Sequence, residues 1–194
     1  SFDLENNFKI DLTGKIDRID ISENGKYFSI IDYKTGKAAI NLIDLYYGLN
    51  LQLITYLLVA NENLIDQMPA AMLYFLIKYP AQSDKKRMTE EEAKEFLESK
   101  LKMPGWILAD KNVIEEIDKS LKFIKVKFND GGFTNGSKKY IKTAEEFKYL
   151  LAYVGKIFQD AGNKINNRSL IFFRSSISRL FLLLLAFSFS FSFF

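Results

Sequence analysis

Neither cysteine nor histidine occurs anywhere in the 194-residue sequence. Without cysteine the chain can form no disulfide, thiol nucleophile or iron–sulfur cluster, and without histidine it can form no Ser-His-Asp triad and no zinc site of the usual kind. Any metal must therefore be held by carboxylate and carbonyl oxygens, which suits Mg²⁺, Mn²⁺ or Ca²⁺. The absence of cysteine also favours a cytoplasmic location.

Charge of one sign is not in large excess either, because 27 Lys and Arg residues face 24 Asp and Glu residues, for a net charge of +3. This balance neither requires nor excludes a nucleic-acid partner, so basic groups that bind DNA would have to be clustered. The length and the 48% of hydrophobic residues suit one globular domain. The chain begins at Ser1 without a signal peptide, and we interpret it as a piece of a longer protein.

The end of the chain differs in composition from the rest. No acidic residue follows Asp160, and beyond Arg179 the sequence contains only Leu, Phe, Ser and Ala. This run is shorter than the stretch of about 20 residues that spans a bilayer, and it has no helical stripe. We interpret residues 168–194 as an aberrant hydrophobic tail produced by a frameshift; a genuine membrane anchor is the alternative.

Hydrophobic periodicity predicts an α/β fold with a mixed sheet flanked by helices. The dipeptide Asn24-Gly25 predicts a hairpin turn, and Thr89 with Glu92 predicts a capping box. We expect the hairpin and the strand at 70–79 in the middle of the sheet, and a polar loop at 81–88. The expected strands cover residues 8–21, 26–34, 70–79 and 122–128, and the expected helices cover 41–61, 89–102, 111–119 and 144–161.

The hairpin turn fixes which residues of its two strands face each other. It places Ile19 opposite Ile30 and Asp17 opposite Asp32, and the pleat puts Lys34 on the same side as Asp32. One face is therefore expected to carry two carboxylates and a lysine beside an apolar patch.

Two opposed carboxylates next to apolar side chains repel each other, and a divalent cation removes this conflict by taking both as ligands. A nearby lysine can stabilise charge on an attacking water or on a phosphate oxygen. The group formed by Asp17, Asp32 and Lys34 thus suits metal-dependent hydrolysis of a phosphodiester. The alternative is a solvated hairpin of mixed charge.

The helix expected after the hairpin carries Gln52 and Tyr56, which share one face because they are four residues apart. We expect them to point toward the hairpin, where they would contact DNA phosphate or hold the lysine. The alternative is that both are core-edge residues with internal hydrogen bonds.

These residues lie in three segments that resemble the motifs of RecB-family nucleases of the PD-(D/E)xK type, and more narrowly the B subunit of AddAB (RexAB) helicase–nucleases. The likeness covers about residues 1–167, a partial nuclease domain. The segments are 14–20 (Gly-Lys-Ile-Asp-Arg-Ile-Asp), 31–36 (Ile-Asp-Tyr-Lys-Thr-Gly) and 48–56 (Gly-Leu-Asn-Leu-Gln-Leu-Ile-Thr-Tyr).

The resemblance implies a restriction-endonuclease-like fold and a Mg²⁺- or Mn²⁺-dependent exonuclease that acts on DNA in double-strand break repair and recombination, with an AddA-like helicase–nuclease partner subunit. It implies Asp17, Asp32 and the main-chain carbonyl of Tyr33 as metal ligands. It further implies Lys34 as the catalytic lysine, with Gln52 and Tyr56 as an auxiliary motif. Arg18 and Thr35 would contact phosphate, against the alternatives of a surface salt bridge and a strand end.

The sequence departs from this family at both ends. The family has an acidic residue or histidine on a helix before the first strand, and four cysteines that hold an iron–sulfur cluster, which this chain cannot form. Three functions are therefore weighed: an active DNA nuclease, a catalytically inactive DNA-binding or scaffold fragment of the same fold, and a membrane-associated protein that uses the tail.

Overall fold

The computed structural model describes residues 2–7, 9–77 and 89–166 of the chain. A five-stranded mixed sheet, in the order β3-β4-β5-β6-β9, forms its centre, and β4–β5 and β6–β9 are the parallel pairs. Two small antiparallel pairs, β1–β2 and β7–β8, lie outside it. The strands are β1 (Phe2–Asp3), β2 (Lys9–Ile10), β3 (Arg18–Ile21), β4 (Tyr27–Lys34), β5 (Met68–Leu76), β6 (Gly105–Leu108), β7 (Phe128–Asn129), β8 (Gly132–Phe133) and β9 (Ile141–Lys142).

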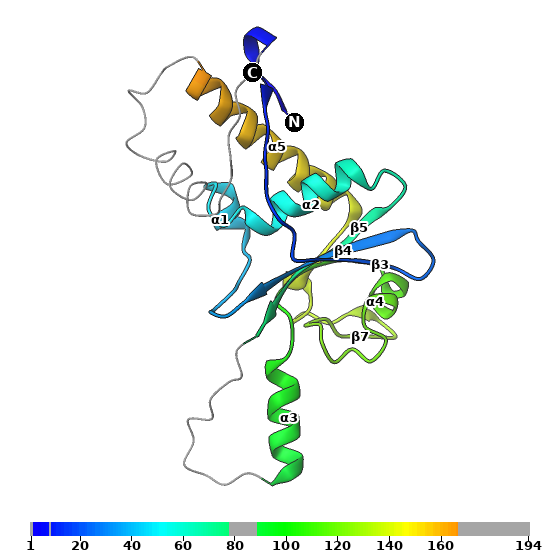
Figure 1. Cartoon of the computed structure of the whole chain (residues 1–194). Helices are drawn as coiled ribbons and strands as arrows, with labels where there is room; N and C mark the ends of the chain where they lie inside the picture. The colour runs from blue at the N-terminus through cyan, green and yellow to red at the C-terminus, as the bar shows by residue number, and fades with distance from the viewer. Residues whose placement is uncertain (1, 8, 78–88, 167–194) are drawn as a thin grey trace.

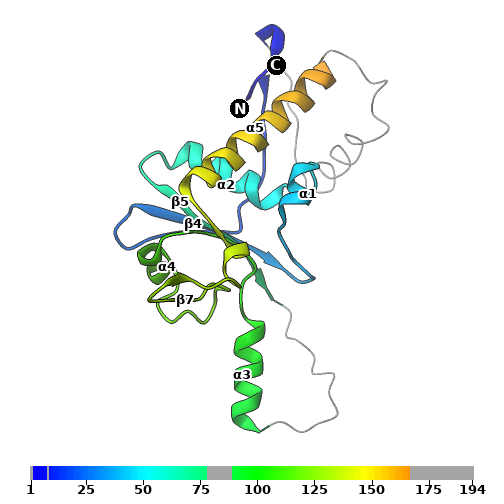
Figure 2. The same cartoon turned by 180° about the vertical axis from the view of Figure 1, so that it is seen from behind.

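Helices cover both faces of this sheet (Figures 1 and 2). On one face α2 and α5 enclose the larger hydrophobic core, and on the other α4 encloses a smaller one. The helix α3 projects away from the sheet in both views. The helices are α1 (Leu42–Tyr46), α2 (Gln52–Asn63), α3 (Glu90–Lys100), α4 (Lys111–Ile117) and α5 (Ala144–Asn166), with 3-10 turns at Glu5–Asn7 and Lys138–Tyr140.

The hairpin register predicted from the turn is confirmed, because Ile19 pairs with Ile30 and Ile21 with Phe28. Gly25 adopts a φ of +70° in the turn, which suits glycine. The position of the hairpin in the sheet was predicted wrongly, since β3 is an edge strand and β5 is central. The apolar patch is accordingly divided: Phe28 and Ile30 are buried, but Ile19 and Ile21 are exposed at the edge.

Two long elements expected in the first third of the chain are each divided. The strand expected at 8–21 consists of β2 and β3, and residues 11–17 between them are not in a strand. The helix expected at 41–61 consists of α1 and α2. Gly48 and Asn50 interrupt it with φ values of +69° and +53°, which no helix interior accommodates. The interruption turns the chain so that α2 begins at Gln52 beside the sheet.

The strand expected at 122–128 is also wrong. The carboxylate of Asp118 accepts hydrogen bonds from the backbone N–H groups of Phe123 and Ile124, at 2.6 and 3.1 Å, and holds this segment as a loop. Only a single bridge, between Ile124 and Met103, forms there before the short β7. The sheet instead gains β6 at Gly105–Leu108, which the alternation of the sequence did not predict.

Other expectations hold closely. The strand β5 and the helices α3 and α4 lie within two residues of their predicted starts, and the capping box of Thr89 with Glu92 is present. Thr143 caps α5 together with Glu146, and that helix continues five residues beyond its predicted end. The predicted loop at 81–88 and the tail at 168–194 lie outside the described residues. Within the described ranges, none of the helices has the length and apolar character needed to cross a membrane.

Candidate active site

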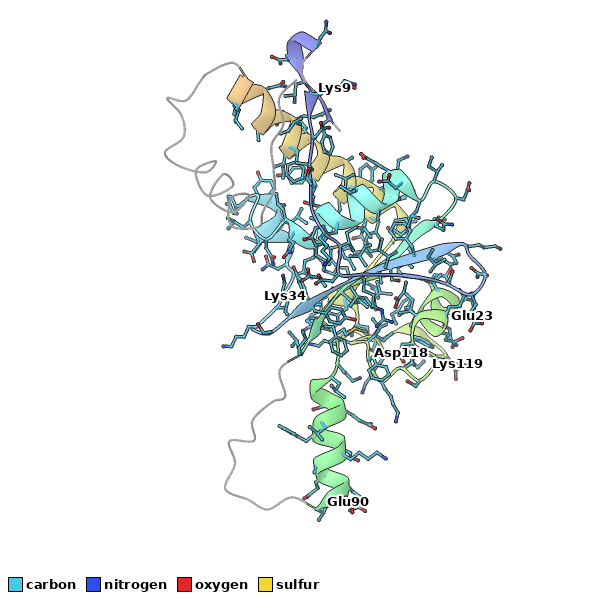
Figure 3. All side chains as sticks on the ribbon, in the orientation of Figure 1. Lys9, Glu23, Lys34, Glu90, Asp118 and Lys119 are labelled. Carbon is cyan, nitrogen blue, oxygen red and sulfur yellow. The ribbon has the colours of Figure 1, made fainter. Side chains whose placement is uncertain are left out.

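The end of β4 carries the predicted pair Asp32 and Lys34, on the face of the sheet that α2 covers. Figure 3 shows Lys34 where the sheet meets this helical layer, at the opposite end of the hairpin from Glu23. Asp32 is only 2% exposed, and its Oδ2 atom lies 2.7 Å from the ammonium of Lys34. The contact is an ion pair by distance, while within the described residues no hydrogen bond of good geometry reaches this oxygen.

Burial raises the pKa of the Asp32 carboxyl above its ordinary value, and the charge of Asp17 also raises it, whereas the close contact with the Lys34 ammonium lowers it. The net direction shows that desolvation outweighs the ion pair. A buried carboxylate whose charge is incompletely compensated is a strong candidate for binding a cation.

Asp17 lies just before β3 and remains exposed. Its Oδ2 atom accepts a 3.0 Å hydrogen bond from the backbone N–H of Tyr33, the residue that follows Asp32. In an extended strand the N–H and C=O of one residue point to the same side, so the carbonyl of Tyr33 is directed toward the same edge of β4 as Asp17. The two carboxylates and this carbonyl are therefore gathered at the end of the hairpin.

Gln52 and Tyr56 lie on the face of α2 that meets Lys34. The ammonium of Lys34 donates a 2.6 Å hydrogen bond to Oε1 of Gln52, and Nε2 of Gln52 donates a 3.0 Å hydrogen bond to the hydroxyl of Tyr56. The auxiliary pair thus holds the lysine, which is one of the two roles expected from the sequence. This chain of contacts fixes the orientation of the Gln52 amide, because the side-chain oxygen must face the lysine.

Sequence reasoning missed two further residues at this site, Tyr74 and Asn50. Tyr74 of β5 pairs with Asp32 in the parallel register, and its ring lies 5.7 Å from the ammonium of Lys34. Burial, together with the charge of Asp32, raises the pKa of the Tyr74 hydroxyl, which donates a 3.1 Å hydrogen bond to Asn50. The continuous apolar run of β5 indicates a strand that is buried on both faces, but the parallel pairing that places Tyr74 beside Asp32 depends on the crossover through α2 and could not be read from the sequence.

Arg18 and Thr35 are not brought into this group. Arg18 pairs with Ile31 in the hairpin, so its side chain emerges on the other face of the sheet from Asp32. Its guanidinium forms a two-pronged hydrogen bond with Asp20, at 2.7 and 2.8 Å. Thr35 is exposed in the bend that follows β4.

The comparison with known proteins agrees with this geometry. A family model described as the PD-(D/E)XK nuclease superfamily matches residues 1–160. The chain belongs to the PD-(D/E)XK nuclease superfamily.

The similar proteins are larger. The chain is 43% identical over 165 residues to a protein of Desulforamulus reducens and 38% identical over 175 residues to one of Acetivibrio thermocellus, which cover 78% and 84% of the chain. A protein of Clostridium novyi is 37% identical over 165 residues, or 79% of the chain. All three are named as the B subunit of an ATP-dependent helicase/deoxyribonuclease. The chain spans only 14–15% of the length of these relatives.

Nucleases of the PD-(D/E)XK superfamily generally use divalent metals, and the residues present fit such an ion. The buried Oδ2 of Asp32, the carboxylate of Asp17 and the carbonyl of Tyr33 offer only oxygen donors, as Mg²⁺ and Mn²⁺ prefer. The described part of the chain contains no cluster of three acidic side chains for a closed protein cage. Two carboxylates suffice for Mg²⁺, which commonly keeps several waters and takes its remaining ligands from substrate phosphates.

Proposed function

We propose that this chain is the catalytic part of a Mg²⁺-dependent deoxyribonuclease that hydrolyses DNA phosphodiesters. The proposal is supported above all by one arrangement: a buried carboxylate, Asp32, in contact with a lysine that Gln52 and Tyr56 hold in place. A purely structural ion pair would be expected to satisfy the buried carboxylate, whereas Oδ2 of Asp32 receives no hydrogen bond of good geometry from the described residues.

In the proposed reaction Asp17, Asp32 and the carbonyl of Tyr33 would hold the cation. Mg²⁺ bound there would supply polarisation of the phosphate and a water of lowered pKa. Lys34 stabilises negative charge on the attacking oxygen or on the phosphate as it develops. Because Gln52 accepts from the lysine ammonium, the lysine enters the reaction already oriented.

We further propose, from the names of the relatives, that the chain acts within a helicase–nuclease and, from the motif resemblance, that it is an exonuclease on DNA ends. Its partners would be DNA and an AddA-like helicase subunit, its role double-strand break repair and recombination, and its location the cytoplasm. Arg18 and Thr35 remain candidates for phosphate contacts only if the bound strand reaches the outer edge of β3 or the bend after β4.

The proposed function is tested with fluorescently labelled linear DNA in the presence of Mg²⁺, Mn²⁺ or EDTA. Cleavage is expected with either metal and should be lost in EDTA and in the variants Asp32→Ala and Lys34→Ala. The melting temperature gives a second readout: Mg²⁺ should raise it for the wild-type chain and for Lys34→Ala, but not for Asp32→Ala.

Three outcomes separate the alternatives. The nuclease proposal would be contradicted by a folded chain that does not cleave DNA when metal is added and whose melting temperature the metal does not change. DNA binding without cleavage would identify an inactive DNA-binding fragment instead. Cleavage that persists in both Asp32→Ala and Lys34→Ala would mean that the activity resides elsewhere or in a contaminant.

A further inference from the structure

A cavity of about 500 Å³ lies next to the candidate active site, between the segment that connects β4 to α1 and the strands β6 and β9. The lining residues from the first segment are mostly small or apolar, whereas the opposite wall carries three lysines. Those lysines are Lys125, Lys139 and Lys142, and they are accompanied by the aromatic residues Trp106 and Tyr140.

Lys142 is the most unusual member of this wall because it is only 7% exposed. Its ammonium donates a hydrogen bond to the carbonyl of Ile141 at 3.1 Å, lies 3.9 Å from a carboxylate oxygen of Glu146, and faces the ring of Trp106 at 5.2 Å. An ammonium group has three donors, and a buried one is stabilised when all of them are used. One hydrogen bond of 3.1 Å and one ion pair of 3.9 Å leave room for an acceptor that enters from the cavity.

The other two lysines converge on the same aromatic ring. Lys125 and Lys139 lie 5.9 and 4.9 Å from the centre of Tyr140. Cation–π contacts hold the two stems in place, and because the ring is already engaged by two ammonium groups, it is poorly suited to stack on a nucleic-acid base. The wall therefore presents positive charge rather than an aromatic platform.

The charge of this cavity is one-sided, since its lining includes three lysines and no aspartate or glutamate. Glu146 partly compensates Lys142, but Lys125 and Lys139 face the same ring and repel each other, and an anion with several oxygens relieves that repulsion. The cavity is also too open and too apolar on its other wall for a small, fully enclosed anion alone. A chain of phosphates, which can pass along the lysines, satisfies both features.

Two hydrogen bonds connect the cavity to the candidate active site. Asn50, which holds the hydroxyl of Tyr74, also donates to the carbonyl of Ala39 on the cavity wall at 2.8 Å. The backbone N–H of Tyr74 donates to the carbonyl of Pro104, another lining residue, at 2.8 Å. The cavity wall and the candidate active site are therefore joined through Asn50 and Tyr74, the residue that pairs with Asp32.

We propose that this lysine cavity binds the phosphate backbone of the DNA strand adjacent to the bond that is cut. The inference rests on the proposed nuclease function and adds a substrate-binding site to it. Because Lys125, Lys139 and Lys142 would contact phosphates only, the site contributes affinity and register without sequence preference. It also gives the strand a path from the end of β4 toward the edge at β9.

The test is binding of a short fluorescein-labelled single-stranded oligodeoxynucleotide in EDTA, where no cleavage occurs, measured by anisotropy at several salt concentrations. The variant Lys125→Glu/Lys139→Glu should lose roughly tenfold or more in affinity at low salt. The slope of its log affinity against log salt concentration should become less steep by about 0.7 for each phosphate that is no longer bound. Lys142→Met, which keeps the buried stem, should weaken binding in the same direction.

The matched control is Lys148→Glu/Lys156→Glu, which makes the same change in net charge. Both control lysines are exposed on α5, and Lys148 lies near Met68, at the end of β5 that is farther from Lys34. Equal loss of affinity in the control, or unchanged affinity in the cavity variant, would overturn the proposed subsite. A wild-type chain that binds DNA through these lysines but never cuts it would contradict the nuclease proposal and leave the subsite standing.

Discussion

The ammonium of Lys34 and the side-chain oxygen of Gln52 are 2.6 Å apart, so the last residue of β4 is fixed by the first residue of α2. Gly48 and Asn50 make this contact possible, because their positive φ values end α1 and let a new helix begin beside the sheet. The lysine is thereby held from one side by a carboxylate and from the other by an amide. Its position depends on the interruption of the helix as much as on the strand that carries it.

Gln52→Ala is expected to lower the rate of DNA cleavage by roughly tenfold to a hundredfold, the usual cost of removing a residue that orients a catalytic group. Lys34 would keep its charge and its contact with Asp32 but lose its second anchor. Tyr56→Phe should have a smaller effect in the same direction, since within the described residues the hydroxyl of Tyr56 reaches Lys34 through Gln52. Single-turnover cleavage at saturating Mg²⁺ measures this, and unchanged rates in Gln52→Ala would show that the lysine needs no such anchor.

Asp32→Asn is expected to make the metal-free chain more stable at neutral pH, by an amount on the order of 1 kcal/mol. Burial raises the pKa of Asp32 above 3.8, so its neutral form is favoured by folding. The stabilisation from the neutral Asp32 carboxyl is fully present below the ordinary pKa of an aspartate, and it is lost as the pH rises through the raised pKa of Asp32. The advantage of the amide should therefore disappear in acid, below about pH 4.

Melting temperatures in EDTA at acid and neutral pH measure this difference. Added Mg²⁺ should reverse the order at neutral pH, because only the wild-type carboxylate gains stability from the ion. If the two proteins melt together in EDTA at every pH, the ionised Asp32 is not destabilising, and the main physical argument for a cation there is lost.

Much of this site could be predicted from the sequence, because its central part is local. The turn at Asn24-Gly25 sets the register, and the register brings Asp17 to the strand that carries Asp32 and Lys34. Contacts made over longer distances could not be predicted. The parallel pairing of β4 with β5, which places Tyr74 beside Asp32, depends on how α2 crosses the sheet.

The segment at 122–128 shows a different limit. Its alternation favours a strand, but hydrogen bonds from its backbone to the carboxylate of Asp118 compete with sheet pairing and prevail. Nothing in the local pattern indicates that an aspartate several residues earlier would fold back onto it. The lysine cavity escaped prediction for a related reason, because this loop, the 3-10 turn at Lys138–Tyr140 and the edge strand β9 bring Lys125, Lys139 and Lys142 together.

Gly105→Ala is expected to destabilise the chain by about 3 kcal/mol, near the upper range for overpacking in a core. A methyl group at this position would collide with the carbonyl oxygen of Met72 and lie 2.8 Å from the Cα atom of Leu73. The strand β6 would have to move away from β5, next to the wall that links Tyr74 to Pro104. Denaturant unfolding measures the loss, and Gly136→Ala, where nothing lies within 4 Å, is the control expected to change stability little.

Arg18→Gln is expected to leave both DNA cleavage and DNA affinity within about twofold of the wild type, since the change removes one exposed charge. The motif resemblance implies a phosphate contact for Arg18, but its guanidinium lies on the face of the sheet opposite to Asp32 and is already engaged by Asp20. The ion pair is half exposed, so its loss should cost no more than about 1 kcal/mol of stability. DNA cleavage and oligonucleotide binding, measured in parallel with the variant Lys125→Glu/Lys139→Glu, test whether Arg18 contacts the DNA. A loss of affinity in Arg18→Gln as large as in the double variant would mean that the strand crosses the outer edge of β3 and not the cavity beside β9.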